Sequence, residues 1–72
     1  MAIELTNEEK TSIVNSHLKN LVYNKYNLTI SVIEENAKIS PNSETLSSLN
    51  SQISEIDDQM AALQAELASL TA

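Results

Sequence analysis

The residues of this chain that could carry chemistry are one histidine and two pairs of adjacent carboxylates. His17 is the only residue of a type that ordinarily titrates near neutrality, and Glu34-Glu35 and Asp57-Asp58 are groups from which acid–base pairs and cation sites are built. Adjacent residues on a helix point about 100° apart, so neither pair converges on one ion by itself. We therefore expect these five side chains on solvated helix faces.

The composition excludes several further classes of chemistry. The 72 residues include no cysteine, no glycine and no arginine. Without cysteine there is neither a disulfide nor a thiol nucleophile, a single histidine does not make a structural zinc site, and a phosphate-cradling loop needs glycine. We expect a protein that is not an enzyme, with no catalytic residue, no metal and no cofactor. The alternative is an enzyme or metal site that joins His17 to carboxylates across a symmetric interface.

The charge of the chain bears on its partners. The formal net charge is −6, and Lys38 is the last positive residue. An acidic surface repels phosphate backbones and anionic lipids, so we expect neither nucleic acid nor membrane as a partner. The sequence opens without a basic stretch followed by an apolar run, and nowhere are 18 consecutive residues apolar. Since these patterns mark signal peptides and membrane spans, we expect a cytoplasmic protein.

The last third of the chain has an apolar pattern of the coiled-coil type. Eight apolar residues follow one another at alternating spacings of three and four, without interruption. This spacing predicts a helix with one continuous apolar seam, which requires cover from another helix. The predicted seam consists of Leu46, Leu49, Ile53, Ile56, Met60, Leu63, Leu67 and Leu70.

A capping signal marks the beginning of an earlier helix. Thr6 and Glu9 have the spacing of a capping box, in which each side chain hydrogen-bonds to the backbone amide of the other residue. This motif and the helical pattern behind it predict a first helix over residues 7–38. Residues 28–32 alternate between apolar and polar and are rich in β-branched side chains, so a short strand there is the alternative.

Proline separates the two helical segments. Pro41 has no backbone donor and disfavours helical geometry in the residue before it. We therefore predict a turn over residues 39–42 and a second helix over residues 43–70. Asn42 or Ser43 can cap the second helix, because both side chains accept hydrogen bonds from backbone amides.

Two helices of similar length joined by a short turn predict an all-α fold, an antiparallel two-helix hairpin that forms a single domain over residues 1–72. Folding the chain about the turn pairs positions whose numbers sum to about 82, and Lys25 then meets Asp57 or Asp58. In this register the seam faces a first stripe on the first helix: Leu18, Val22, Tyr26, Ile30, Ile33 and Ala37. An extended parallel coiled coil through the second helix is the alternative architecture.

The first predicted helix has more apolar surface than one neighbour covers. A second stripe, Val14, Leu21, Leu28, Val32 and Ile39, lies about 130° from the first stripe. This second stripe is the predicted oligomer or partner face. We expect hairpins to associate as a homo-oligomer, a dimer or a tetramer, most simply as a four-helix bundle. Tyr26 lies on the first stripe and is therefore expected in the core of the hairpin, whereas Tyr23 lies at the edge of this stripe and is the best candidate for a contact outside the hairpin.

The opening Leu5-Thr6-Asn7-Glu8-Glu9-Lys10 and the closing Ala61-Ala62-Leu63-Gln64-Ala65-Glu66-Leu67 resemble small helical proteins of marine tailed phages. The resemblance implies action in the cytoplasm of an infected host cell or in a virion, and it transfers no functional residues. The sequence predicts a non-enzymatic homo-oligomeric helical protein that acts through protein–protein contacts. The alternative is a small acidic adaptor or inhibitor that binds a host protein through the spare apolar stripe of the first helix.

Overall fold

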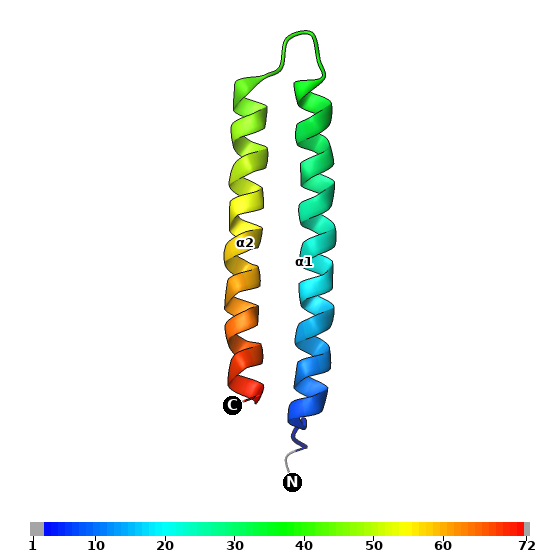
Figure 1. Cartoon of the computed structure of the whole chain (residues 1–72), viewed down its shortest axis with the longest axis vertical. Helices are drawn as coiled ribbons and strands as arrows, with labels where there is room; N and C mark the ends of the chain where they lie inside the picture. Colours follow the sequence, from blue (N-terminus) through cyan, green and yellow to red (C-terminus); the bar gives the residue numbers. More distant parts are fainter. Residues whose placement is uncertain (1–2, 72) are drawn as a thin grey trace.

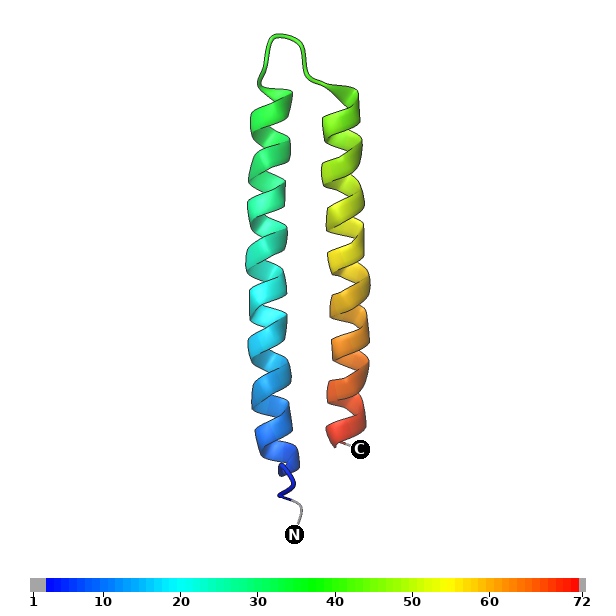
Figure 2. The same cartoon turned by 180° about the vertical axis from the view of Figure 1, so that it is seen from behind.

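The computed structural model describes residues 3–71, and these residues form two long helices that pack against each other. Helix α1 spans Asn7–Asn36 and helix α2 spans Ser43–Thr71 (Figure 1). The beginning of α1 lies beside the end of α2, and the connecting loop closes the opposite end, so the helices are antiparallel. Figure 2 shows the same pairing from behind. Residues 28–32 lie inside α1, so the strand alternative is wrong.

The first helix begins where its capping signal predicts. The Thr6 hydroxyl accepts a hydrogen bond from the Glu9 amide at 3.1 Å, and the Glu9 carboxylate accepts one from the Thr6 amide at 2.9 Å. The hydrogen bond that the Glu9 carboxylate accepts from the Thr6 amide holds the pKa of Glu9 below its ordinary value, and the Thr6 side chain beside the carboxylate lowers this pKa further. The capping box therefore fixes a negative charge at the positive end of the helix dipole.

The first helix ends at Asn36, two residues earlier than predicted. Ala37 is its C-cap, and the Ala37 amide still donates to the carbonyl of Ile33 at 3.1 Å. The next amide, that of Lys38, donates to the carbonyl of Glu35 at 3.2 Å, which is a tighter turn than the α-helix has. The chain therefore leaves the helix before the proline rather than at it.

The second helix begins at Ser43, as predicted, and ends at Thr71. Asn42 is its cap, because the Asn42 side-chain oxygen accepts from the amide of Thr45 at 3.0 Å. The Asn42 carbonyl also accepts from the amide of Leu46 at 3.1 Å, which closes the first helical turn. Of the two residues that the sequence offered as caps, the structure uses Asn42.

The helices pair in the predicted register. Lys25 Nζ lies 2.6 Å from Asp57 Oδ1, and the numbers of these residues sum to 82. At the open end of the hairpin, Asn7 Nδ2 donates to the carbonyl of Leu70 at 3.3 Å. All eight residues of the α2 seam are half-buried. An extended parallel coiled coil would have to use the same α2 seam between two chains. Because α1 already covers this seam within one chain, the structure does not favour that alternative.

The first helix turns a different side toward α2 than predicted. Ten positions of α1 are half-buried or buried, and eight of them form an alternating series that we call the α1 seam: Thr11, Val14, Leu18, Leu21, Lys25, Leu28, Val32 and Glu35. The other two, Thr29 and Ser31, lie beside this series. Four of the five residues of the predicted partner face, Val14, Leu21, Leu28 and Val32, are thus half-buried in the hairpin, and only Ile39 is exposed. Of the first stripe, Leu18 is half-buried, whereas Val22, Tyr26, Ile30, Ile33 and Ala37 are exposed. The predicted assignment of the two stripes is therefore wrong.

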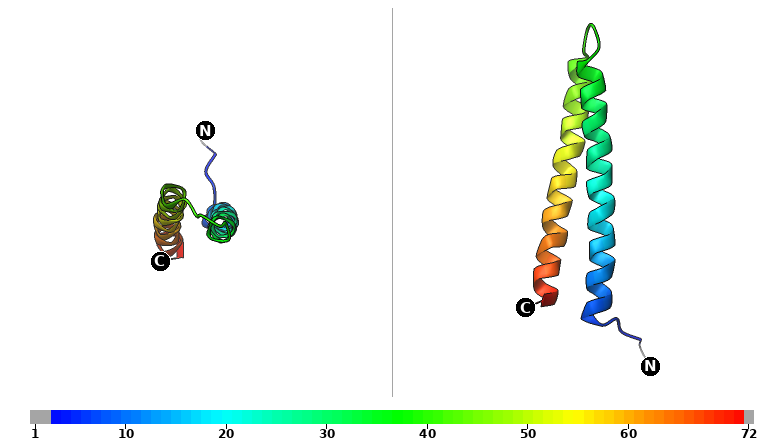
Figure 3. Two further views of the ribbon diagram at one scale, coloured as in Figure 1. Left: turned by 90° about the horizontal axis from the view of Figure 1, so that it is seen from above. Right: turned by 45° about the vertical axis from the view of Figure 1, so that its right-hand side comes forward.

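The spacing of residues explains why the α1 seam, and not the expected stripe, faces α2. The α1 seam alternates between three and four, as the α2 seam does, and two helices stay in contact along their length when both repeat every 3.5 residues on average. The expected stripe from Leu18 to Ala37 has spacings of four, four, four, three and four. Such a stripe winds around the helix and leaves the contact line. Figure 3 shows α2 inclined to α1, as in supercoiled pairs.

Candidate functional site

The residues singled out for chemistry do not converge in the described chain. His17, Glu34, Asp57 and Asp58 are all exposed, and Asp57 is paired with Lys25. Within residues 3–71, no group of three or more histidine, cysteine, aspartate or glutamate side chains could hold a metal ion. Nor is any helix in this range long and apolar enough to cross a membrane.

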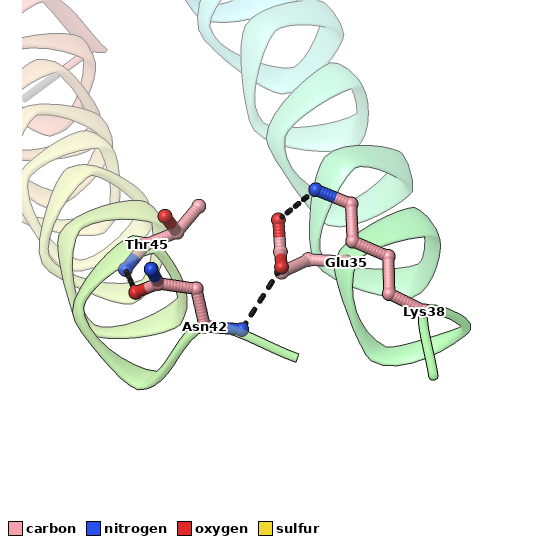
Figure 4. Close-up of polar contacts among 4 residues, drawn as sticks. All are labelled: Glu35, Lys38, Asn42 and Thr45. Atoms are coloured by element: carbon pink, nitrogen blue, oxygen red, sulfur yellow. Dashed lines mark hydrogen bonds and ion pairs between the residues drawn. The ribbon is translucent and has the colours of Figure 1, made fainter. Parts of the chain in front are cut away.

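Glu35 has a structural partner instead of a catalytic one. Its side chain lies between the last turn of α1 and the first turn of α2 (Figure 4). Glu35 Oε2 accepts from the backbone amide of Asn42 at 3.0 Å, and Oε1 accepts from Lys38 Nζ at 2.9 Å. With 7% of its surface exposed, Glu35 is the most buried of the described residues. We call this arrangement of Glu35, Lys38 and Asn42 the loop latch.

The loop latch also determines the charge of Glu35. The hydrogen bond from the Asn42 amide lowers the pKa of Glu35, and the bond from Lys38 lowers it further. Burial acts in the opposite direction and is outweighed. The carboxylate therefore stays ionised at neutral pH, which suits a group that accepts hydrogen bonds and not one that donates a proton.

One open depression runs along the hairpin between the helices. It has a volume of about 400 Å³ and opens widely to solvent. Most of its lining side chains are neutral amides, which bind polar groups but do not transfer protons. The lining residues are Asn24, Asn27, Leu28, Gln52, Glu55, Ile56 and Gln59. A single carboxylate without a second titratable group beside it offers no acid–base pair.

The most distinctive surface feature is an apolar stripe on α1 beside the contact with α2. We call it the outer stripe; its members are Val22, Tyr26, Ile30 and Ile33. Tyr26 is 66% exposed and Ile33 is 58% exposed, so the expectation that Tyr26 lies in the core is wrong. These residues recur every three or four positions and share one side of the helix half that is nearer the loop. Tyr23 borders the stripe and is 70% exposed.

The family models, the curated proteins and the solved structures that were compared with this chain all lack a match. Within helices α1 and α2, the outer stripe is the surface where several large apolar side chains are exposed side by side.

The sequence contains a signal that would have identified the outer stripe. The α1 seam keeps the strict alternation of three and four, but Thr11, Lys25 and Glu35 interrupt its apolar character. A search for apolar residues alone passes over such a seam and selects the purely apolar stripe beside it. A search for the same period in both helices finds the seam and leaves the outer stripe free.

Proposed function

We propose that this chain is a non-enzymatic helical protein that acts through protein–protein contacts, first with further copies of itself. The hairpin is its building block, and a four-helix bundle of two hairpins is the simplest assembly. We expect this action in the cytoplasm, which for a phage protein is the cytoplasm of the infected host cell. The support comes from the surface of the single hairpin.

The main support for self-association is that the single hairpin has no buried apolar core within residues 3–71. Among the described residues, no apolar side chain is buried, and even the apolar residues of the two seams are only half-buried. A compact monomer of this mass exposes about 4,400 Å², whereas this chain exposes 5578 Å². A helical pair without a buried core has little to offset the conformational entropy of ordering its residues. Association supplies the missing buried surface.

A second candidate function is that of a small acidic adaptor or inhibitor with a foreign protein as its partner. The exposure of the outer stripe favours this candidate, because amphipathic helices bind apolar grooves through residues at this spacing. The surface for such a partner is the outer stripe, since most of the originally predicted stripe is half-buried against α2. A partner in this role competes with self-association.

Molar mass measured by light scattering across a wide range of protein concentration tests the proposal. We expect a dimer or tetramer that persists to low micromolar concentration, and a partial loss of helix content when the oligomer dissociates into single hairpins. A folded monomer at every concentration would contradict the proposal and favour the adaptor. Circular dichroism at the same concentrations reports the helix content.

A further inference from the structure

We propose that two hairpins pair through the outer stripe, with the α1 helices of the two copies side by side and antiparallel. This inference rests on the proposed homo-oligomer and adds its interface and its orientation. The contact takes place over the loop-proximal half of each α1. The two-fold axis lies near residue 28, and the two loops point to opposite ends of the dimer.

The exposed area fits a dimer. The surface of the chain exceeds that of a compact monomer of its mass by about 1,200 Å², and a stable interface buries about 800 Å² on each partner. The hairpin is long and thin, with extents of 61 × 21 × 15 Å, so this excess is spread along its sides. The exposed large apolar side chains of the helices all belong to α1. The α1 surface is therefore where the excess can be buried.

The charges indicate a second copy of this chain as the occupant. Helix α2 has five carboxylates and no lysine, whereas α1 has four carboxylates and three lysines. A basic foreign protein would be attracted to α2, which has no exposed large apolar residue. Two acidic chains repel least where their nearly neutral helices meet. The outer stripe lies on the nearly neutral helix.

The positions within the stripe are self-complementary when one copy is reversed. In the antiparallel arrangement Val22 meets the partner's Ile33, and Tyr26 meets the partner's Ile30. The paired numbers sum to 55 and 56, so each contact has a symmetric counterpart on the other side of the axis, as a two-fold interface requires. Each pair places a smaller side chain or a ring against a β-branched isoleucine, and antiparallel helix dipoles attract each other.

The charges at the two ends of the stripe select the antiparallel orientation over the parallel one. Lys19 lies before the stripe and Glu34 lies at its end, and both are exposed. Reversing one copy brings Lys19 close to the partner's Glu34, twice in each dimer. A parallel pair would instead bring the two lysines together and the two glutamates together, which is unfavourable.

A charge placed in the stripe tests the interface. We expect Ile33→Asp to raise the dimer dissociation constant about a hundredfold, because a buried, unpaired carboxylate opposes association. The matched control is Ile13→Asp, since Ile13 is 46% exposed and also lies on α1 but outside the stripe. Light scattering across a concentration series gives both constants. Equal effects of the two substitutions, or an unchanged constant for Ile33→Asp, would overturn the interface.

A distance measurement tests the orientation with the outer stripe intact. The chain has no cysteine, so Asn15→Cys provides a single exposed position for a spin label. The antiparallel dimer separates the two labels by about 38 Å along the helix axis, at 1.5 Å per residue. A parallel dimer brings them to about 10 Å, the spacing of packed helices. A short distance would overturn the orientation.

The outcomes separate this inference from the proposed function. A monomer at every concentration contradicts both. A dimer that Ile33→Asp leaves intact, or that has short label distances, contradicts the inference and leaves the homo-oligomer standing. A dimer that dissociates with Ile33→Asp but not with Ile13→Asp, and that has the long label distance, supports both.

Discussion

The two helices of the hairpin have nearly the same length but present very different surfaces. Helix α2 has one apolar line, its seam of eight residues, and its remaining surface is polar, acidic or small. Helix α1 has two lines, a seam interrupted by polar residues and the exposed outer stripe. Helix α2 therefore buries its apolar residues against α1 alone, whereas α1 keeps a second apolar surface exposed. The comparison teaches that the helix with the more regular apolar pattern is the one with less apolar surface left over.

Among the substitutions that test this difference between the helices, truncation of the α2 seam should change the free energy of unfolding most. Leu63→Ala removes part of a half-buried side chain that faces α1, and we expect it to lower the free energy of unfolding by about 2 kcal/mol. Urea unfolding followed by circular dichroism measures this loss. Ile33→Ala is the matched control on the outer stripe. Below the dimer dissociation constant it should change the free energy of unfolding by less than about 0.5 kcal/mol. A larger effect from Ile33→Ala would mean that the outer stripe, like the α2 seam, stabilises the single hairpin.

Removing the charge from the α1 seam should make the two helices more alike. Lys25→Leu replaces a part-exposed ion pair, worth about 0–1 kcal/mol, with an apolar side chain against the α2 seam. We expect the free energy of unfolding to rise by about 1 kcal/mol. The urea midpoint measures this change, and Asp57→Asn shows the effect of losing the ion pair alone. A midpoint below that of the unmodified chain would show that the ion pair contributes more than packing does.

Acid should weaken the connection between the helices, with the smallest effect of the three. The pKa of Glu35 is held below its ordinary value of 4.5 by the Asn42 amide and by Lys38. A lowered pKa contributes stability that is fully present above pH 4.5 and is lost as the pH falls through the pKa of the folded state. We expect Glu35→Gln to melt below the unmodified chain at pH 7 and close to it at pH 3.

The exposed neighbour Glu34 provides the control for this titration. Below the dimer dissociation constant, where the Glu34 side chain is exposed to solvent, we expect Glu34→Gln to differ from the unmodified chain by the same amount at both pH values. Thermal unfolding at the two pH values gives the comparison. A difference between Glu35→Gln and the unmodified chain that stays constant from pH 7 to pH 3 would mean that the loop latch does not depend on an ionised Glu35.

Local signals in the sequence predicted most of the fold. The capping box at Thr6 and Glu9 placed the start of α1, and the proline at position 41 placed the break. The α2 seam and the sum rule for paired positions predicted the antiparallel register that Lys25 and Asp57 confirm. These features succeed because each depends on a few neighbouring residues or on an uninterrupted period.

The face of α1 could not be predicted from apolar character alone. Lysine covers apolar surface with its methylene stem while its amine reaches solvent, so Lys25 can occupy a seam position that a search for apolar residues rejects. Glu35 is admitted to the seam by the loop latch, whose second partner, Asn42, belongs to the next helix. The contact between Glu35 and Asn42 forms only when the chain folds back on itself. The residues next to Glu35 in the sequence therefore do not predict that Glu35 is buried.

The loop latch also has a consequence for the order in which the hairpin forms. Glu35 and Asn42 are 7 positions apart, whereas Asn7 and Leu70, which meet at the open end, are 63 positions apart. Closing a short loop costs less chain entropy than closing a long one, so we expect pairing to start at the latch and to proceed toward the two ends. We expect the helices to fray first at the open end of the hairpin and last at the latch. The outer stripe thus lies on the part of the hairpin that folds first and opens last.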